Sequence, residues 1–525
     1  MRLLLAAFLV LAGCKTLQKT PDAVLTALSA SKDGYLSGTP LALGAATVLN
    51  REDFVYDAKL SPDGSLAAIS RLGMKSFHLS LHDLVAPTGT PRADPAVNPL
   101  EFDVDSVEFS PDGAVVATVS RDGALRLFSS AKGELLSAWL TEEPLVSVAW
   151  HPSGSMLALG GAKGLVTLLS FPQLRHVAEV RPHTDEVRAV AFTPAGELVT
   201  GGWDQKLLVF TLADAVLPPR EVRTHVTKKN GLVLFRAVID RSASATVALD
   251  ERLPVLVVKS ALAQALGIDV LKVTDTLQVQ TAFGTQLAKL VKGRELSVKN
   301  LTLSQVDLAV CDACVPAEAQ AVLGGPVLQQ LSTAFDDSSA ELVFTVNESA
   351  KLASVGAAKS LQLAREFKFP ASVNDFSLDA KGAVAGVAFS ETKSERTKAV
   401  YDREKKREVE PEREWDCGAR VDLLTGQVLE KKHGHRGVVA TASISPDGKT
   451  LATGGWDKKV IVHGVKPIVD DDYGWAVRRV RFSRDGRKLV TAAWTPQNPL
   501  NNHQSDPSAV VFEVVYDGTA SVSGR

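Results

Sequence analysis

The chain has 525 residues, of which 45% are apolar and 22% charged, and this composition excludes a wholly disordered chain, a collagen and a polytopic membrane protein. At about 100–200 residues per domain, the length predicts three or four domains, or one large repeat fold with additions. The formal charge of −2, from 58 basic and 60 acidic residues, argues against nucleic acid as a partner, because phosphate binding needs a basic face.

The N-terminal segment is typical of a signal peptide. Arg2 precedes an uncharged apolar run that is too short to span a bilayer. The run ends in Leu11-Ala12-Gly13-Cys14, which resembles the lipobox of bacterial lipoproteins. The resemblance implies that residues 1–13 are removed and that Cys14 receives a lipid, so that the protein is anchored to a membrane of the bacterial cell envelope and faces the periplasm or the cell surface. The alternative is a plain secretory signal with a chance cysteine. Residues 14–40 are expected to form a tether.

A short turn that ends in glycine recurs seven times and predicts a repeat fold. Proline at the second position of such a turn presets φ, and glycine supplies a positive φ. Four of the six spacings between these glycines are 38 to 49 residues, close to a propeller blade of about 40–45, while the other two, 186 and 66, indicate insertions. The turns are Ser61-Pro62-Asp63-Gly64, Ser110-Pro111-Asp112-Gly113, His151-Pro152-Ser153-Gly154, Thr193-Pro194-Ala195-Gly196, Asp379-Ala380-Lys381-Gly382, Ser445-Pro446-Asp447-Gly448 and Ser483-Arg484-Asp485-Gly486.

Two of these segments resemble WD repeats. In that family a histidine before the first strand and an aspartate in the turn between the second and third strands are hydrogen-bonded within the blade. The chain departs from the family in one respect, because its Trp-Asp dipeptides lie in that turn and not at the end of the repeat. A metal or catalytic role for these residues is the less favoured alternative. The residues at the matching positions are His183 with Asp204, His435 with Asp457, and the turn aspartate Asp122.

Seven turns predict a seven-bladed propeller made from two separated stretches. Residues 41–220 are expected to form blades one to four and residues 362–525 blades five to seven. The strand-like segment from Leu41 to Leu49 is expected to supply the outer strand of the last blade and so to close the ring. The charged segment 392–414 carries mixed signs, which favours a solvated loop over a binding arm.

The long spacing leaves room for one inserted domain, residues 221–361. An apolar strand at 232–239 runs into Asp240-Arg241-Ser242-Ala243-Ser244, and a helix-like segment ends at Gly267. A hairpin at 279–285 and a Leu-Gly pair before a second helix follow. This order resembles the retroviral-type aspartyl proteases, particularly their bacterial single-lobe relatives. The overall expectation is therefore an all-β fold: a seven-bladed WD-repeat-like β-propeller with an inserted, retropepsin-like, mainly-β domain.

The resemblance implies that Asp240 occupies the catalytic position. One lobe supplies one aspartate, so catalysis requires a homodimer in which two carboxylates share a proton around a water. The sequence departs from the family here, because Arg241 and Ser242 replace Thr/Ser and Gly. The cation of Arg241 would hold Asp240 ionised and prevent proton sharing. The alternative is a protease-derived fold kept for binding or dimerisation.

The remaining motifs predict no cofactor and no metal. Cys311 and Cys314 form a C-x-x-C motif that lacks a second pair for zinc, so a local disulfide or two free thiols are the alternatives, with Cys417 apart from them. The favoured function is a lipid-anchored scaffold that binds other proteins or peptides and has a degenerate protease-like domain. The alternative is a membrane-anchored aspartic endopeptidase that works as a homodimer through Asp240.

Overall fold

The structure is a computed structural model, and it describes residues 36–37, 40–50, 54–72, 76–85, 87, 90–99, 103–141, 143–214, 221–240, 243–281, 284–355, 359–389, 400–402, 407–409, 415–464, 467–471, 473, 476–494, 508–516 and 521–522. The predicted signal peptide, Cys14, Arg241 and Ser242 lie outside these residues. Among the described residues no helix has the length and apolar character needed to span a membrane.

Four-stranded antiparallel sheets make up the larger part of the chain, and seven of them lie within the described residues. The first three sheets are continuous in sequence: β3 (Val55–Leu60), β4 (Leu66–Leu72), β5 (Ser76–Asp83) and β6 (Ala96–Pro99); β7 (Val104–Phe109), β8 (Val115–Ser120), β9 (Ala124–Ser129) and β10 (Leu135–Leu140); β11 (Leu145–Trp150), β12 (Met156–Gly161), β13 (Val166–Ser170) and β14 (His176–Val180).

The other four sheets include two that an insertion interrupts and one that combines both ends of the chain. They are β15 (Val187–Phe192), β16 (Leu198–Gly202), β17 (Lys206–Asp214) and β30 (Lys359–Lys368); β31 (Val373–Leu378), β32 (Val384–Phe389), β35 (Trp415–Asp422) and β36 (Val428–His435); β37 (Val439–Ile444), β38 (Leu451–Gly455), β39 (Val460–His463) and β40 (Ile468–Asp470); β41 (Val477–Phe482), β42 (Lys488–Ala493), β43 (Ala509–Tyr516) and β2 (Pro40–Asn50).

The recurring turns form because their side chains bond to their own backbone. In the first turn the Ser61 hydroxyl donates to Asp63 at 2.5 Å and accepts from the Leu66 amide at 2.9 Å. Gly64 adopts a φ of 69°, which other residues rarely tolerate. The same pair of bonds recurs at Ser110, Ser445 and Ser483. Each turn therefore fixes a hairpin between the first two strands of a blade.

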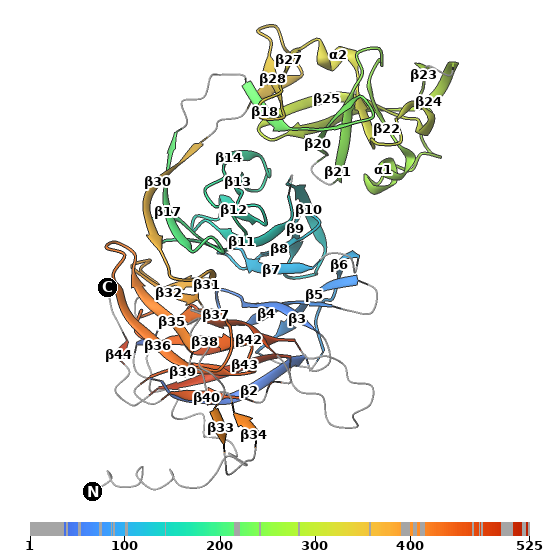
Figure 1. The fold of residues 1–525 in the computed structure, drawn as a ribbon. Helices are drawn as coiled ribbons and strands as arrows, with labels where there is room; N and C mark the ends of the chain where they lie inside the picture. Colours follow the sequence, from blue (N-terminus) through green and yellow to red (C-terminus); the bar gives the residue numbers. More distant parts are fainter. Residues whose placement is uncertain are drawn as a thin grey trace, which may run out of the picture.

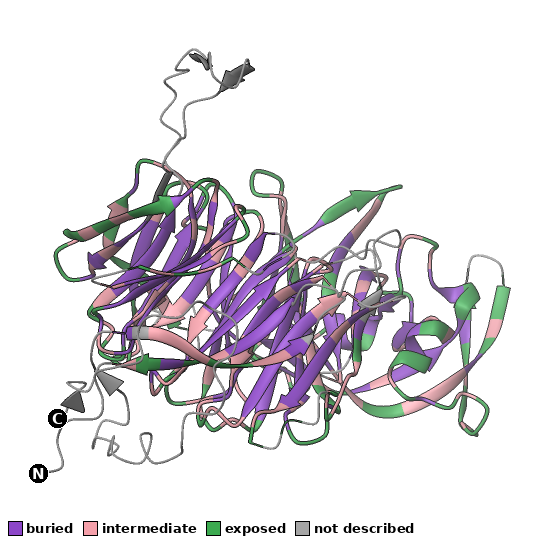
Figure 2. Cartoon of the chain, turned by 90° about the horizontal axis from the view of Figure 1, so that it is seen from below, coloured by how far each residue is buried: buried purple, intermediate pink, exposed green. Residues whose placement is uncertain are grey.

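The seven sheets form a closed ring of blades. Their first strands contact one another in chain order, and β3 also contacts β41 of the last blade. Buried residues fill the strands of the blades (Figure 2), because each sheet packs both faces against its neighbours. The prediction that residues 41–49 close the ring is confirmed, since β2 pairs with β43 along its length.

Two insertions interrupt the ring. The larger one lies between the third and fourth strands of blade four, β17 and β30, and the predicted domain boundary after residue 361 falls inside β30. The smaller one lies between β32 and β35. There a short hairpin of β33 (Val400–Asp402) and β34 (Arg407–Val409) occurs within the segment that was expected to be a loop.

The larger insertion folds into a separate, mainly-β lobe beside blades two and three (Figure 1). Its buried apolar residues form two clusters. Parallel pairs join β21 (Ala243–Leu249) with β26 (Ala321–Leu323) and β22 (Leu256–Val258) with β25 (Leu301–Val310). Cys311 and Cys314 form a disulfide. The lobe contains β18 (Glu221–His225), β19 (Thr227–Lys229), β20 (Leu232–Ile239), β21 (Ala243–Leu249), β22 (Leu256–Val258), α1 (Ser260–Ala265), β23 (Thr276–Thr281), β24 (Gly284–Val298), β25 (Leu301–Val310), β26 (Ala321–Leu323), α2 (Gly325–Leu328), β27 (Leu331–Asp336), β28 (Glu341–Val346) and β29 (Ala353–Val355).

Candidate functional site

Asp240 lies in the tight turn that joins β20 to β21. Ile239 and Ala243 are the last paired residues of this hairpin. Asp240 adopts a φ of 49°, and its amide donates to the Glu295 carbonyl at 2.8 Å. Aspartate tolerates this left-handed conformation better than most residues, which suits it to a turn.

The carboxylate of Asp240 is already bound by groups of β24. Arg294 donates to Oδ2 at 2.7 Å, and the Glu295 amide donates to Oδ1 at 3.0 Å. The pairing of β20 with β24 brings these residues together although they are more than 50 positions apart. Sequence reasoning therefore missed Arg294 as the cation beside Asp240.

A second aspartate in the lobe, Asp250, occupies a different structural position. It directly follows β21, and its amide donates to the Leu323 carbonyl at 3.1 Å. Leu249 and Leu323 are partners in the parallel pair of β21 and β26. Asp250 also follows an apolar strand, so the sequence contained the same signal for it as for Asp240.

The loop after Asp250 packs directly on two glycines that follow β26. A Cβ added to Gly324 would lie 2.3 Å from the Val255 carbonyl oxygen, and one added to Gly325 would lie 2.4 Å from that of Glu251. Only glycine allows the two backbones to approach this closely. The pair Leu323-Gly324, which belongs to the protease-like sequence pattern, therefore packs against the loop that follows Asp250. Asp240 lies instead in the hairpin turn between β20 and β21.

Arg252 binds both oxygens of the Asp250 carboxylate. Its Nε donates to Oδ1 at 2.8 Å, its terminal nitrogen donates to Oδ2 at 2.7 Å, and its amide donates to Oδ1 at 3.1 Å. The hydrogen bond from Arg252 lowers the pKa of Asp250. If Asp250 is aligned with the catalytic aspartate, Glu251 and Arg252 stand where the family has Thr/Ser and Gly. Arg252 thus favours the ionised form of Asp250, whereas a catalytic pair must share a proton.

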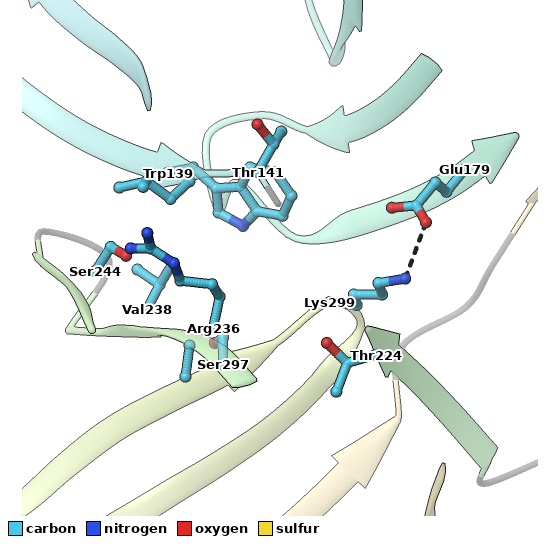
Figure 3. Close-up of a pocket in the computed structure, with 11 residues that line it drawn as sticks. Trp139, Thr141, Glu179, Thr224, Arg236, Val238, Ser244, Ser297 and Lys299 are labelled. Atoms are coloured by element: carbon cyan, nitrogen blue, oxygen red, sulfur yellow. Dashed lines mark hydrogen bonds and ion pairs between the residues drawn. The ribbon is translucent and has the colours of Figure 1, made fainter. Parts of the chain in front are cut away.

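The cavity between the lobe and the propeller is small. It has a volume of about 20 Å³, and its lining includes Trp139 of β10 and Val238 of β20 (Figure 3). Lys299 of the lobe donates to Glu179 of β14 at 2.9 Å. Burial raises the pKa of Glu179, but the nearby His176 and the charge of Lys299 lower it to about 2. The cavity has room for about one water. The ion pair of Lys299 with Glu179 at its edge joins the lobe to the propeller.

The predicted WD-type residues lie within their blades. His183 contacts Asp204 and Thr200, each at 2.8 Å. His435 contacts Asp457 at 2.7 Å and Thr453 at 2.9 Å in the same way. Asp122 accepts from Arg126 at 2.6 Å and from the Ala124 amide at 2.9 Å. No group of three or more potential metal ligands occurs in the part of the chain that the structure describes.

Buried charges cross the centre of the ring. Arg479 of β41 lies 2.8 Å from Asp57 of β3 and 3.1 Å from Asp375 of β31. Arg481 lies 2.6 Å from Asp375. Burial raises the pKa of Asp375, but the charges of Arg481 and Arg479 hold it well below its usual range. This network joins blades one, five and seven inside the channel, and sequence reasoning missed it because the paired residues are more than 100 positions apart.

Comparisons with known proteins agree with this architecture. Residues 230–327 match the family model described as aspartyl protease, and residues 100–129, 174–211 and 426–463 match the model described as WD domain, G-beta repeat. The chain therefore contains WD40 repeats with an inserted aspartyl protease domain.

A curated relative shares part of the chain. The UBP9-binding protein bun62 of Schizosaccharomyces pombe (strain 972 / ATCC 24843) is 34% identical over 109 residues, which are 19% of this chain. The chain covers only 20% of the length of that relative.

Proposed function

We propose that the protein is a protein-binding scaffold whose protease-like lobe does not hydrolyse peptides. The proposal depends most on the carboxylate of Asp250, which accepts two side-chain hydrogen bonds from Arg252. A dyad needs one carboxylate that is protonated, and a bidentate guanidinium opposes protonation. WD40 domains generally bind proteins, and the fission yeast relative is named as a binding protein. Both facts support a scaffold role.

Peptide cleavage tests this proposal. A quenched fluorescent peptide library is incubated with the full chain at acidic and at neutral pH, alongside the Asp240→Asn and Asp250→Asn variants. We expect the wild type to cleave no faster than either variant. Cleavage that is lost in Asp250→Asn would overturn the proposal. Cleavage that is lost only in Asp240→Asn would instead support the alternative, a homodimeric endopeptidase acting through Asp240.

We further propose that a lipid on Cys14 anchors the protein to a membrane of the bacterial cell envelope. The support is the signal-like N-terminus and its lipobox-like end, Leu11 to Cys14. In a bacterial host, labelled fatty acid should enter the wild type and not a Cys14→Ala variant, and only the wild type should sediment with membranes. Equal labelling of both proteins would contradict the anchor.

A further inference from the structure

The seven recurring turns lie at one end of the ring, which we call the turn face. In a blade of four antiparallel strands, the first turn and the connection between the third and fourth strands lie at the same end. Hydrogen bonds join the two: the Ser130 amide donates to the Ala114 carbonyl at 3.0 Å, and the Leu423 amide donates to the Ala383 carbonyl at 2.9 Å. Equivalent bonds occur in blades one, three and seven. The turn face therefore includes two connections of each of these blades.

Neighbouring turns of the turn face pack against each other around the ring. A Cβ added to the glycine of a turn would lie 2.7–3.9 Å from the preceding turn in five cases. In the last blade, Lys488 donates to the carbonyl of Gly64 in the first turn at 2.8 Å. The turns and the connections bonded to them therefore lie at one level. The five contacts are Gly113 with Pro62, Gly154 with Pro111, Gly196 with His151, Gly382 with Pro194 and Gly448 with Asp379.

Most of the large exposed apolar side chains of the propeller lie at the turn face. Val85, in the connection after the third strand of blade one, is 82% exposed, and Leu424, in the same connection of blade five, is 76% exposed. Single exposed apolar residues are ordinary, but their restriction to one end is not. Among the described residues of the propeller, those elsewhere are Trp203, Trp456 and Val469. The others at the turn face are Leu135, Leu136, Leu363, Val428, Leu429 and Val515.

The inserted lobe docks away from the turn face. Its contact with the propeller includes Trp139 at the end of β10, Thr141 directly after it, and Glu179 near the end of β14. These fourth strands begin at the turn face, so their last residues lie at the opposite end. The docked lobe therefore leaves the turn face accessible in the described part of the molecule.

The N-terminal segment enters the propeller at the turn face. β2 begins at Pro40, whose partner in the sheet is Tyr516, and the Tyr516 hydroxyl donates to the carbonyl of Gly486 in the last turn at 2.7 Å. A fully extended chain from Cys14 to Pro40 would span about 90 Å. A tether of this length allows any orientation of the ring, so the surface of the protein determines which orientation is adopted.

The charges and the shape of the turn face favour a lipid surface as its partner. The exposed charged residues of the turns have both signs, so attraction between charges selects no partner. Apolar side chains on separate blades at one level meet a flat surface together, whereas a globular partner reaches only some of them. In the headgroup region of a bilayer, burial of their apolar area stabilises the contact. The exposed charged residues are Asp63, Asp112, Lys381, Lys449 and Arg484.

We propose that the turn face lies on the membrane surface, with Val85, Leu136 and Leu424 in the headgroup region. The opposite end of the ring then faces away from the lipid. The inference rests on the proposed lipid anchor and adds the orientation in which the anchored ring is held.

Quenching of a fluorescent reporter by lipid tests this inference. The mature chain, residues 14–525, carries an N-terminal hexahistidine tag and is bound to phosphatidylcholine vesicles through a nickel-chelating lipid. Cys14→Ser and Cys417→Ser leave an introduced cysteine as the site for the dye. The vesicles contain a lipid with a spin label on its acyl chain, which quenches nearby dyes. We expect the dye to be quenched several-fold more strongly in Lys132→Cys, an exposed position of the turn face, than in Thr184→Cys at the opposite end. Equal quenching at both positions would overturn the inference.

A variant with Val85→Ser, Leu136→Ser and Leu424→Ser should lose this difference between the two positions, because its turn face has less apolar area to bury. The matched control combines Leu271→Ser, Leu287→Ser and Val469→Ser, which are equally exposed changes elsewhere, and should keep the difference. An unchanged thermal midpoint in both variants shows that they are folded. A difference that survives in the first variant would also overturn the inference. Because the tag replaces the lipid, absent fatty-acid labelling of the wild type counts against the anchor, whereas lost orientation on these vesicles counts against the turn face.

Discussion

Buried histidines in the blades make the propeller sensitive to acid. Burial lowers the pKa of His82 to about 4 and that of His463 to about 3, from an ordinary value of 6.5. The unfolded chain therefore binds protons at a higher pH than the folded one. The stability from these groups is fully present above pH 6.5 and is lost as the pH falls below it.

We expect each of the two histidines to lower the free energy of unfolding by about 2 kcal/mol between pH 7.5 and pH 5. The measurement is the thermal unfolding midpoint at several pH values. His82→Gln removes one titrating group, so its midpoint should fall less steeply with acid than that of the wild type. The exposed His225, replaced in the same way, serves as the control. An unchanged slope in His82→Gln would refute the explanation.

At the scale of elements, local patterns in the sequence were sufficient to predict the blades. The turn glycines and the Ser–Asp pairs act within five residues, as at Ser61 and Leu66, so local sequence accounts for the hairpins at the four turns that have this pair. The closing strand was also predictable, because its apolar residues had no other blade to join.

The lobe contains contacts that local sequence patterns do not predict. Asp240 and Asp250 both follow an apolar strand. Asp250 differs because β21, which precedes it, pairs in parallel with β26, and because Gly324 packs against the loop that follows it. No local sequence pattern indicates either contact. Arg294 and Arg252 bind the two carboxylates through pairings that depend on the fold or on side-chain rotamers. The insertion point inside blade four was hidden for the same reason, since β30 pairs with β17 across the whole lobe.

At the scale of the whole molecule, the lobe is docked on the outer strands of blades two and three. Val238 of the lobe packs in the apolar cluster of Trp139, and Lys299 pairs with Glu179. The Lys299 and Glu179 side chains are 15% and 24% exposed, so solvent weakens their attraction only in part. These contacts hold the lobe in one orientation relative to the ring.

We expect Lys299→Met to loosen this docking, because it leaves the partly buried Glu179 without its cation at a cost of about 1–3 kcal/mol. Hydrogen exchange should accelerate in β10 and β14 and stay unchanged in the blades on the far side of the ring. Lys272→Met, an exposed change within the lobe, is the control. Equal exchange in all three proteins would show that the pair contributes nothing to docking.

The pairing of β2 with β43 also determines when the molecule can finish folding. A ribosome makes β2 before the other blade strands and β43 after them, so β2 has no partner until those blades have been synthesised. Contacts between distant parts of a chain form slowly, and ring closure is therefore the late step of assembly. A chain that stops before β43 keeps an unpaired strand edge, the kind of surface that leads to aggregation. Closure by β2 thus makes synthesis of β43 a condition for a stable ring.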